Sequence, residues 1–320
     1  MRKIGKLFYY FITFLLIYSC GQKEKPPQVE IKKLNYPSAS AVEYYDGKLY
    51  IMGDDAPNMI ILDTNLNIID SVSIVLHPAN RIPKDSKPDL EAAAFYGIDS
   101  DPTIFLFGSG SLDPFRNSGW KYSLHTKTRD NIYLQPLYNR IKQTGIQQLN
   151  IEGAAFVNDK LVLVNRGNKS YPFNHLIITN ESSLLNDTNF QISIIPLPAQ
   201  KDTTSFKGIS GLCYAKESDK LIMTVSIEDT KSTYEDGAIG KSYLWIINDI
   251  STKLNNKAIK RDRVIDLEYI DSGFKGQKIE SAVVIKETDR SIYLVLVADN
   301  DDGSSTIFKM SIEKTRILGE

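Results

Sequence analysis

A seven-residue motif recurs five times along the chain, and this repetition limits the folds that the sequence can adopt. In each copy an aliphatic or small residue precedes Glu or Ser, and small residues and an apolar end follow. The copies are residues 38–44, 89–95, 150–156, 208–214 and 278–284. The equivalent residues are Ser40, Glu91, Glu152, Ser210 and Glu280, so the mean spacing is 60 residues. A period of this length indicates a repeat architecture.

Each motif copy is followed by a turn and by further runs rich in aliphatic, β-branched and aromatic residues. Turn-forming pairs such as Asp46-Gly47 and Asn158-Asp159 separate the first two runs. Four short strands in each of five units predict an all-β fold, a β-propeller with five blades of four strands. A six-bladed propeller is the alternative, because the longest step, from Ser210 to Glu280, could hold additional strands.

Two segments lie outside the repeat. The sequence predicts a strand over residues 29–34 that has no partner in the first unit, while the last unit lacks a fourth strand. We therefore expect this N-terminal strand to close the ring against the last blade, which removes two exposed sheet edges. Residues 136–143 lack strand alternation and predict a short helix between blades.

The N-terminus has the pattern of a secretory signal. Arg2, Lys3 and Lys6 precede an apolar run over residues 7–18, which is shorter than the roughly 20 residues of a membrane helix. Ser19-Cys20-Gly21 resembles a bacterial lipobox, which predicts a signal peptide over residues 1–19 and a lipid anchor on Cys20 carrying acyl chains such as palmitate. A plain signal peptide with an incidental Cys is the alternative.

The predicted lipoprotein consists of a polar tether over residues 20–28 and a single propeller domain over residues 29–320. We expect it to be a monomer that is anchored to a bacterial membrane. The outer membrane is the first choice, with the protein facing the periplasm or the cell surface. Cleavage before Cys20 removes three of the 38 basic residues and none of the 39 acidic ones, which leaves a net charge of −4. A nucleic-acid-binding protein would be expected to show a basic excess instead.

The motif residues define a candidate functional site. In a propeller the start of the innermost strand and the end of the second strand meet at one mouth of the central channel, and loops on a rigid scaffold commonly carry function. The second strands are followed or ended by polar residues, as at Asp54, Arg166 and Glu228. The residues expected to bind a ligand at this mouth are Asp54, Arg166, Ser210, Glu228 and Asp299.

Glu91, Glu152 and Glu280 are the candidate metal ligands. Three carboxylates that converge on one axis repel each other, so their pKa values rise or a positive charge lies between them. Ca²⁺ suits such a set, because it prefers oxygen ligands. The alternative is structural: each Glu caps backbone amides of the next blade or pairs with Lys207, Lys278 or Arg166.

The motif also resembles a known group of proteins. Ile151-Glu152-Gly153 is similar to the Glu-Gly motif of the phytase-like (esterase-like) and SdiA-regulated β-propeller families, and Leu90-Glu91-Ala92 and Ile279-Glu280-Ser281 keep the Glu without the Gly. Over residues 37–310 the resemblance consists of the repeated order of motif, turn and strand. It implies a propeller with a Ca²⁺ site at the channel mouth.

Two functions are compatible with these features. The first is a non-catalytic, lipid-anchored propeller that binds a small ligand or a protein at the channel mouth, since the sequence offers no pair of nucleophile and base. The second is a metal-dependent hydrolase of phosphoesters or lactones, in which Glu228 or Asp54 acts as a base. In that case an anionic substrate would be held by Lys84, Lys87, Arg166 and Lys169.

Overall fold

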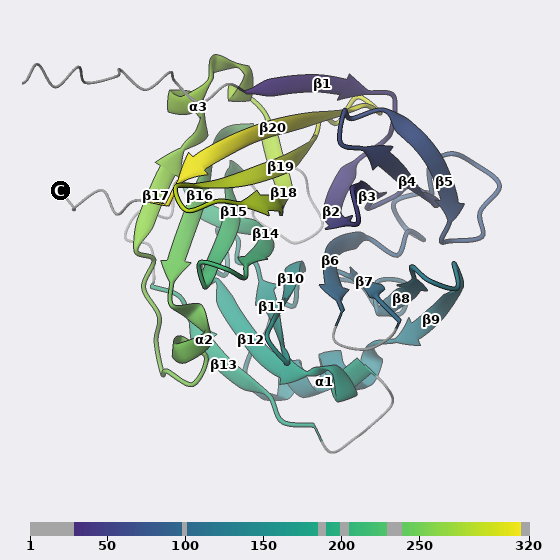
Figure 1. Cartoon of the computed structure of the whole chain (residues 1–320). Helices are drawn as coiled ribbons and strands as arrows, with labels where there is room; N and C mark the ends of the chain where they lie inside the picture. The colour runs from purple at the N-terminus through teal and green to yellow at the C-terminus, as the bar shows by residue number, and fades with distance from the viewer. Residues whose placement is uncertain (1–28, 98–100, 185–189, 199–204, 229–238, 315–320) are drawn as a thin grey trace, which may run out of the picture.

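The five motif copies form the innermost strands of five antiparallel sheets that are arranged as blades around a central axis (Figure 1). The computed structural model describes residues 29–97, 101–184, 190–198, 205–228 and 239–314. Each sheet has four strands, so the prediction of a five-bladed propeller is confirmed and the six-bladed alternative is wrong. The predicted signal peptide, Cys20 and the tether lie outside the described residues.

Four blades are built from consecutive strands that run in chain order from the axis outward. Blade 1 contains β2 (Ala39–Tyr45), β3 (Lys48–Gly53), β4 (Asn58–Asp63) and β5 (Ile68–Ser73). Blade 2 contains β6 (Leu90–Tyr96), β7 (Thr103–Gly108), β8 (Ser118–Ser123) and β9 (Arg129–Tyr133). Blade 3 contains β10 (Ile151–Val157), β11 (Lys160–Asn165), β12 (His175–Asn180) and β13 (Ser193–Pro196). Blade 4 contains β14 (Lys207–Ala215), β15 (Lys220–Glu228), β16 (Ile239–Asn248) and β17 (Arg263–Asp266).

Blade 5 joins the two ends of the domain. It contains β18 (Lys278–Glu287), β19 (Ser291–Asp299), β20 (Ser305–Glu313) and, as its outermost strand, β1 (Glu30–Leu34). The antiparallel register pairs Glu30 with Lys309 and Leu34 with Ser305. Leu34 is buried in the core between blades 5 and 1. The predicted closure of the ring by the N-terminal strand is therefore confirmed.

In the part of the chain that the structure describes, helices occupy only the connections between strands. The helix α1 (Gln135–Gln143) follows blade 2, where a helix was expected, and it has Pro136 in its first turn. Leu137, Tyr138 and Ile141 are its buried face and join the core between blades 2 and 3. The remaining helical segments are short: α2 (Ile250–Lys253), α3 (Leu267–Ile270), η1 (Glu181–Leu184) and η2 (Ser272–Phe274). Among the described residues no helix is both long and apolar enough to cross a membrane.

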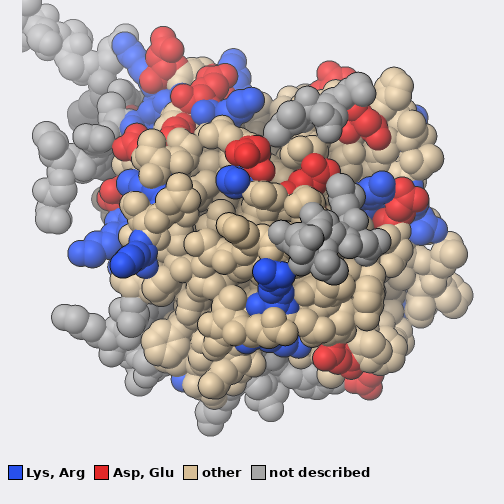
Figure 2. All heavy atoms as spheres, turned by 90° about the horizontal axis from the view of Figure 1, so that it is seen from below, with Lys and Arg blue, Asp and Glu red and all other residues tan. Residues whose placement is uncertain are grey.

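The hydrophobic core is divided among the interfaces between neighbouring blades. Each of the five clusters of buried side chains in the described residues joins two adjacent blades. Near the axis the backbones approach closely: a Cβ added to Gly153 would lie 2.7 Å from the Leu212 nitrogen in the next blade. This crowding explains the small residues of the motif. On the face seen in Figure 2, basic and acidic side chains lie interspersed among neutral ones, in line with a net charge of −1.

All five inner strands share one irregularity. The register shifts across Ala39/Ala41, Leu90/Ala92, Ile151/Gly153, Ile209/Gly211 and Ile279/Ser281. The unpaired residue in each case is the motif residue: Ser40, Glu91, Glu152, Ser210 or Glu280. A β-bulge re-aims the side chain of its extra residue. The motif therefore marks a conformation that each blade repeats at the same end of its inner strand.

Candidate functional site

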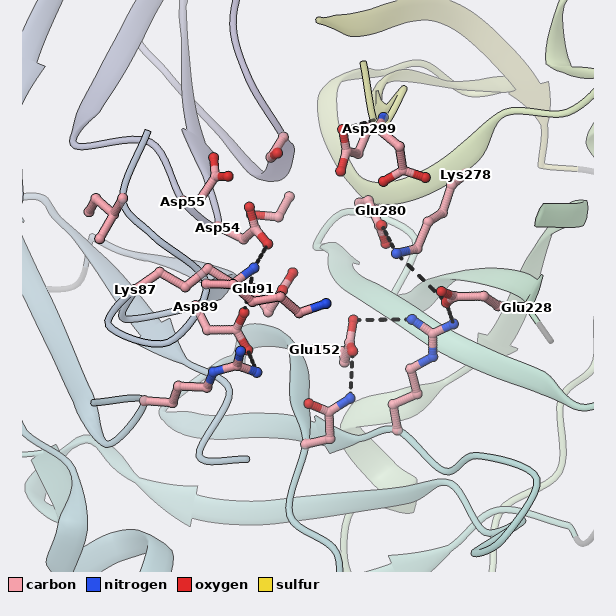
Figure 3. Close-up of a pocket in the computed structure, with 18 of the residues that line it drawn as sticks. Asp54, Asp55, Lys87, Asp89, Glu91, Glu152, Glu228, Lys278, Glu280 and Asp299 are labelled. Atoms are coloured by element: carbon pink, nitrogen blue, oxygen red, sulfur yellow. Dashed lines mark hydrogen bonds and ion pairs between the residues drawn. The ribbon is translucent and has the colours of Figure 1, made fainter. Parts of the chain in front are cut away.

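The bulged ends of the inner strands surround a polar cavity of about 400 Å³ at one mouth of the channel. Nine carboxylates and six basic side chains line it, which is an excess of three acidic groups. The cavity brings together seven of the eight predicted metal and ligand-binding residues: Asp54, Glu91, Glu152, Arg166, Glu228, Glu280 and Asp299. Figure 3 shows that the labelled carboxylates among them converge from several blades.

One group of charges, the Arg166 cluster, consists of Glu152, Arg166, Glu228, Lys278 and Glu280. Arg166 follows β11 and binds Glu228 at 2.7 Å and Glu152 at 3.4 Å. Lys278 lies 2.9 Å from Glu280 and 3.7 Å from Glu228. All three carboxylates are at most 7% exposed. Two built-in cations thus neutralise much of the charge of this cluster, as the structural alternative for Glu152 and Glu280 expected, whereas Lys207 instead lies over the ring of Tyr243.

The second group, the Lys87 cluster, consists of Asp54, Lys87, Asp89, Glu91 and Arg116. The Lys87 ammonium contacts Asp54 and lies 2.8 Å from Asp89. Arg116 binds the other oxygen of Asp89 at 2.7 Å. Ligand oxygens of Asp54, Asp89 and Glu91 lie within 4.8 Å of one another. This is the one group of three or more such ligands within that distance among the described residues, so Glu152 and Glu280 do not share a compact metal site with Glu91.

Glu91 differs from the other carboxylates of the Lys87 cluster. Among the described residues, neither a basic side chain nor a hydrogen-bond donor contacts its carboxylate, although cations hold both neighbouring Asp residues. It lies at the cavity and is partly exposed. Asp54 offers a second free atom, because its Oδ1 is buried and has no hydrogen-bond partner. The cluster therefore has carboxylate oxygens left over for a cation.

Burial dominates the electrostatics of the cavity. Burial, with the charges of Asp89 and Asp54, raises the pKa of Glu91 well above its ordinary value. Burial also raises the pKa of Glu280 to about 8, although Lys278 opposes the rise, and it raises the pKa of Asp299 to about 7. Such raised values are common at functional sites, where like charges and burial are combined. A bound cation would reverse them by favouring the ionised carboxylates.

The two Ser copies of the motif serve a different purpose. The Ser40 hydroxyl donates to the backbone oxygen of Leu90 at 2.5 Å, and the Ser210 hydroxyl donates to that of Ile279 at 2.6 Å. Each thus binds the backbone just before a bulged Glu in a neighbouring blade. Ser210 was predicted to bind a ligand, but it does not line the cavity and is 1% exposed. These contacts fix the strand ends that carry Glu91 and Glu280.

Sequence reasoning missed Asp89 and Arg116. Asp89 is the first residue of the second motif copy, two residues before Glu91, and was not considered as a site residue, while Arg116 lies in the loop between β7 and β8. Their ion pair joins the start of the motif copy to this loop, and Ser109 adds a hydrogen bond of 2.5 Å to Asp89. Asp89 has a φ of 56°, an unusual value for a residue with a side chain. Of the lysines expected to hold an anion, Lys84 and Lys87 line the cavity and Lys169 does not.

Comparisons with known proteins identify a family and a fold. A protein-family model described as a family of unknown function (DUF6929) matches residues 35–312. No curated protein matches the chain.

Similar solved structures include a GH43 β-1,3-galactosidase in complex with galactodeoxynojirimycin, which is 11% identical with a TM-score of 0.50, covering 86% of this chain and 90% of that one. They also include glutaminyl cyclase of Myxococcus xanthus, at 10% identity and a TM-score of 0.46, covering 91% and 100%. A member of the DUF4221 family from Bacteroides vulgatus is 13% identical with a TM-score of 0.37, covering 84% and 76%. At these identities the likeness concerns the fold alone.

Proposed function

We propose that this protein, which belongs to the family of unknown function DUF6929, is a binding propeller that takes up a divalent cation, Ca²⁺ first, in the Lys87 cluster. The observation that carries the proposal is Glu91, a carboxylate that lines the cavity beside Asp54 and Asp89 and forms neither an ion pair nor a hydrogen bond among the described residues, although the nearby charge of Lys87 acts on it. The bound cation would in turn help to hold a small polar ligand or a protein segment at the channel mouth.

The donor set fits Ca²⁺. Hard cations prefer carboxylate oxygens, and Ca²⁺ accepts irregular arrangements of six to eight ligands, whereas Mg²⁺ requires a near-ideal octahedron. Glu91 supplies its carboxylate, and Asp54 supplies the buried Oδ1 that lacks a hydrogen-bond partner. Of the three Glu residues that the sequence suggested as ligands, the proposal keeps Glu91. Glu152 and Glu280 are already bound to Arg166 and Lys278.

The Lys87 ammonium would compete with such a cation for the same carboxylates. Its ammonium contacts Asp54 and Asp89, two of the three proposed ligands. Burial alone would lower the pKa of Lys87, but the charges of Asp54 and Asp89 outweigh it and raise that pKa above its ordinary value, so the ammonium stays charged. A divalent cation must therefore share the cluster with this charge or displace it. Removing the ammonium should strengthen Ca²⁺ binding, which a purely structural cluster would not show.

The test is calorimetric titration of the purified protein with Ca²⁺, together with thermal melts in Ca²⁺ and in chelator. The wild type should be stabilised by Ca²⁺, by about 2.7 kcal/mol at a hundredfold excess over Kd. Glu91→Gln should bind at least about tenfold more weakly, since a charged ligand is lost at similar size. Lys87→Gln should bind more tightly than the wild type. Glu280→Gln is the matched control, because its carboxylate belongs to the Arg166 cluster.

Two results would overturn the cation site. The first is a wild type with no Ca²⁺-dependent change in melting temperature and no heat of binding. The second is a Glu91→Gln variant that binds Ca²⁺ as the wild type does. In either case the cavity would remain a network of ion pairs that holds the blades together.

We further propose that the propeller acts at a bacterial membrane surface, anchored through Cys20. The lipobox-like Ser19-Cys20-Gly21 at the end of an apolar N-terminal run supports this location. An anchored binding domain would meet ligands in the periplasm or outside the cell, where Ca²⁺ is abundant enough for weak sites.

A metal-dependent hydrolase of phosphoesters or lactones is the second candidate, in keeping with the resemblance of the motif to phytase-like propellers. Its support is the presence of basic side chains and carboxylates in one cavity. The two bases suggested by the sequence are poorly suited, because Glu228 is bound by Arg166 and Lys278 and Asp54 by Lys87. Glu91 has the raised pKa and the free carboxylate that a general base requires.

Ca²⁺-dependent turnover of a nitrophenyl phosphate and of a simple lactone would distinguish the two functions. Turnover that is lost in Glu91→Gln would favour the hydrolase. A protein that binds Ca²⁺ but turns over neither substrate would favour the first candidate function, the non-catalytic binding propeller.

A further inference from the structure

A second cavity, of about 230 Å³, lies at the opposite mouth of the channel from the polar one. Its lining comes from the later residues of all five inner strands, whereas the bulged residues of four of these strands line the polar cavity. The two mouths differ in chemistry. The residues at the second mouth are mainly aromatic and aliphatic, and the charged ones among them are Glu43 and the exposed Lys216.

The aromatic residues occupy one equivalent position in the repeat. Four residues after the bulged residue, four of the five blades have an aromatic side chain, and the fifth has Val284. These aromatic residues are Tyr44, Phe95, Phe156 and Tyr214. All four line the second cavity. Blades therefore contribute aromatic rings to this mouth as regularly as they contribute polar side chains to the other.

Glu43 breaks the repeat at the adjacent position. Three residues after the bulge the other blades have small or apolar residues: Ala94, Ala155, Cys213 and Val283. A carboxyl group among aromatic rings and aliphatic side chains is costly unless something compensates for it. Burial raises the pKa of Glu43 to about 8, and the backbone amides of Phe95 and Tyr44 only partly offset the rise. Without a cation the carboxyl group therefore tends to keep its proton, and an organic cation beside it would favour the ionised form.

From these observations we propose that the second mouth is a binding site for an alkylammonium group, with Glu43 as its counter-ion and the aromatic ring faces as its walls. An ammonium that carries methyl or methylene groups satisfies both parts of the site, because it is attracted to the negative faces of aromatic rings and to a carboxylate. A neutral apolar ligand would leave Glu43 protonated and gain no ion pair, whereas a cation beside it favours the ionised carboxylate.

Neighbouring rings hold the walls in place. The rings of Tyr96 and Phe156 lie 4.6 Å apart between centroids, and Phe95 stacks on Tyr45 at 5.1 Å. Gly97 lies against the Phe95 ring, because a Cβ there would come within 2.7 Å of it. Walls that are fixed before the ligand arrives lose little conformational freedom on binding, which favours affinity.

The test compares choline with 3,3-dimethyl-1-butanol, its neutral isostere, as probes titrated into the purified protein and followed by calorimetry or NMR. Choline should bind saturably, and the neutral alcohol should bind at least about tenfold more weakly, as expected when a cation–π contact and an ion pair are lost. Glu43→Gln should weaken choline binding by about tenfold or more at an unchanged fold. Phe156→Leu keeps the apolar bulk but removes one ring, so it should weaken choline and not the alcohol.

Glu91→Gln, at the other mouth, is the matched control and should bind choline as the wild type does. The ammonium site would therefore remain supported if the Ca²⁺ site were disproved, and the Ca²⁺ site would remain supported if the ammonium site were disproved. Equal affinity for choline and the neutral alcohol, or wild-type choline affinity in a folded Glu43→Gln variant, would overturn the ammonium site. So would the absence of saturable choline binding.

Discussion

Arg166 and Glu228 form an ion pair of 2.7 Å that joins the residue after the second strand of blade 3 to the end of the second strand of blade 4. Both residues are 7% exposed. The Arg166 side chain passes directly over Gly208 of β14, where an added Cβ would lie 2.3 Å from Nε. A motif copy that begins with Gly thus leaves the space through which Arg166 reaches the channel mouth.

Replacing Arg166 with Met should destabilise the protein by about 3–5 kcal/mol, because it leaves two buried carboxylates without their shared partner. Denaturant unfolding measures the change. The double variant Arg166→Met with Glu228→Gln should regain part of the loss. Lys241→Met is the control: Lys241 also contacts an acidic residue, Asp266, at 2.8 Å, but the pair is solvent-exposed, so the free energy of unfolding should hardly change. A similar effect of both single variants would contradict the role of the Arg166 cluster in stability.

Closure of the ring can be tested at β1. Leu34 is 4% exposed, and truncation to Ala should cost about 2–5 kcal/mol. Lys33 is adjacent, and its ion pair with Asp302 is solvent-exposed, so Lys33→Ala should leave the melting temperature nearly unchanged. Deletion of residues 29–34 should lower the melting temperature more than Leu34→Ala does, since it also exposes the edge of β20. An unchanged melting temperature after the deletion would show that β1 is dispensable.

The stability of the protein should depend on pH through Glu43. In the folded protein its pKa is about 8, whereas the ordinary value is 4.5. Between these pH values the folded state keeps a proton that the unfolded chain has lost, so the contribution of Glu43 to stability is complete below pH 4.5 and declines as the pH rises toward 8. Unfolding of the wild type and of Glu43→Gln across this range checks the sign: the difference in stability between them should shift in favour of the variant as the pH rises. A difference that is independent of pH would show that the pKa of Glu43 is not raised.

The anchor is tested by Cys20→Ser. Without the thiol no acyl chain can be attached, so the variant should move from the membrane fraction to the soluble periplasmic or extracellular fraction. Fractionation followed by immunodetection measures the distribution. If the variant stays in the membrane pellet, another part of the protein holds it there.

The repeat predicted most of the fold, because strand periodicity and turn residues are local properties of the sequence. The spacing of Glu91, Glu152 and Glu280 identified both the inner strands and the channel mouth. The β-bulge accounts for this success. It lies where neighbouring backbones approach closely, so in each copy small residues must follow the polar residue.

The ion pairs of the mouth were harder to predict. Asp89 begins a motif copy, but its partners Lys87 and Arg116 lie in two loops outside the motif, and loops follow no repeat. The aromatic position of the second mouth was, in contrast, readable from the sequence. Aligning the copies four residues past the motif residue reveals Tyr44, Phe95, Phe156 and Tyr214, but attention to polar residues alone passes over them.

The arrangement of blade 5 has a consequence for the order of synthesis. In blades 1 to 4 each strand pairs with its neighbours in the chain, so pairing can begin as soon as a blade has been translated. β1 is made before all other strands, and its partner β20 is made last. Until β20 has left the ribosome, β1 has no sheet to join and the first and fifth blades cannot meet. Closure of the ring must therefore wait until the last strand of blade 5 has been synthesised.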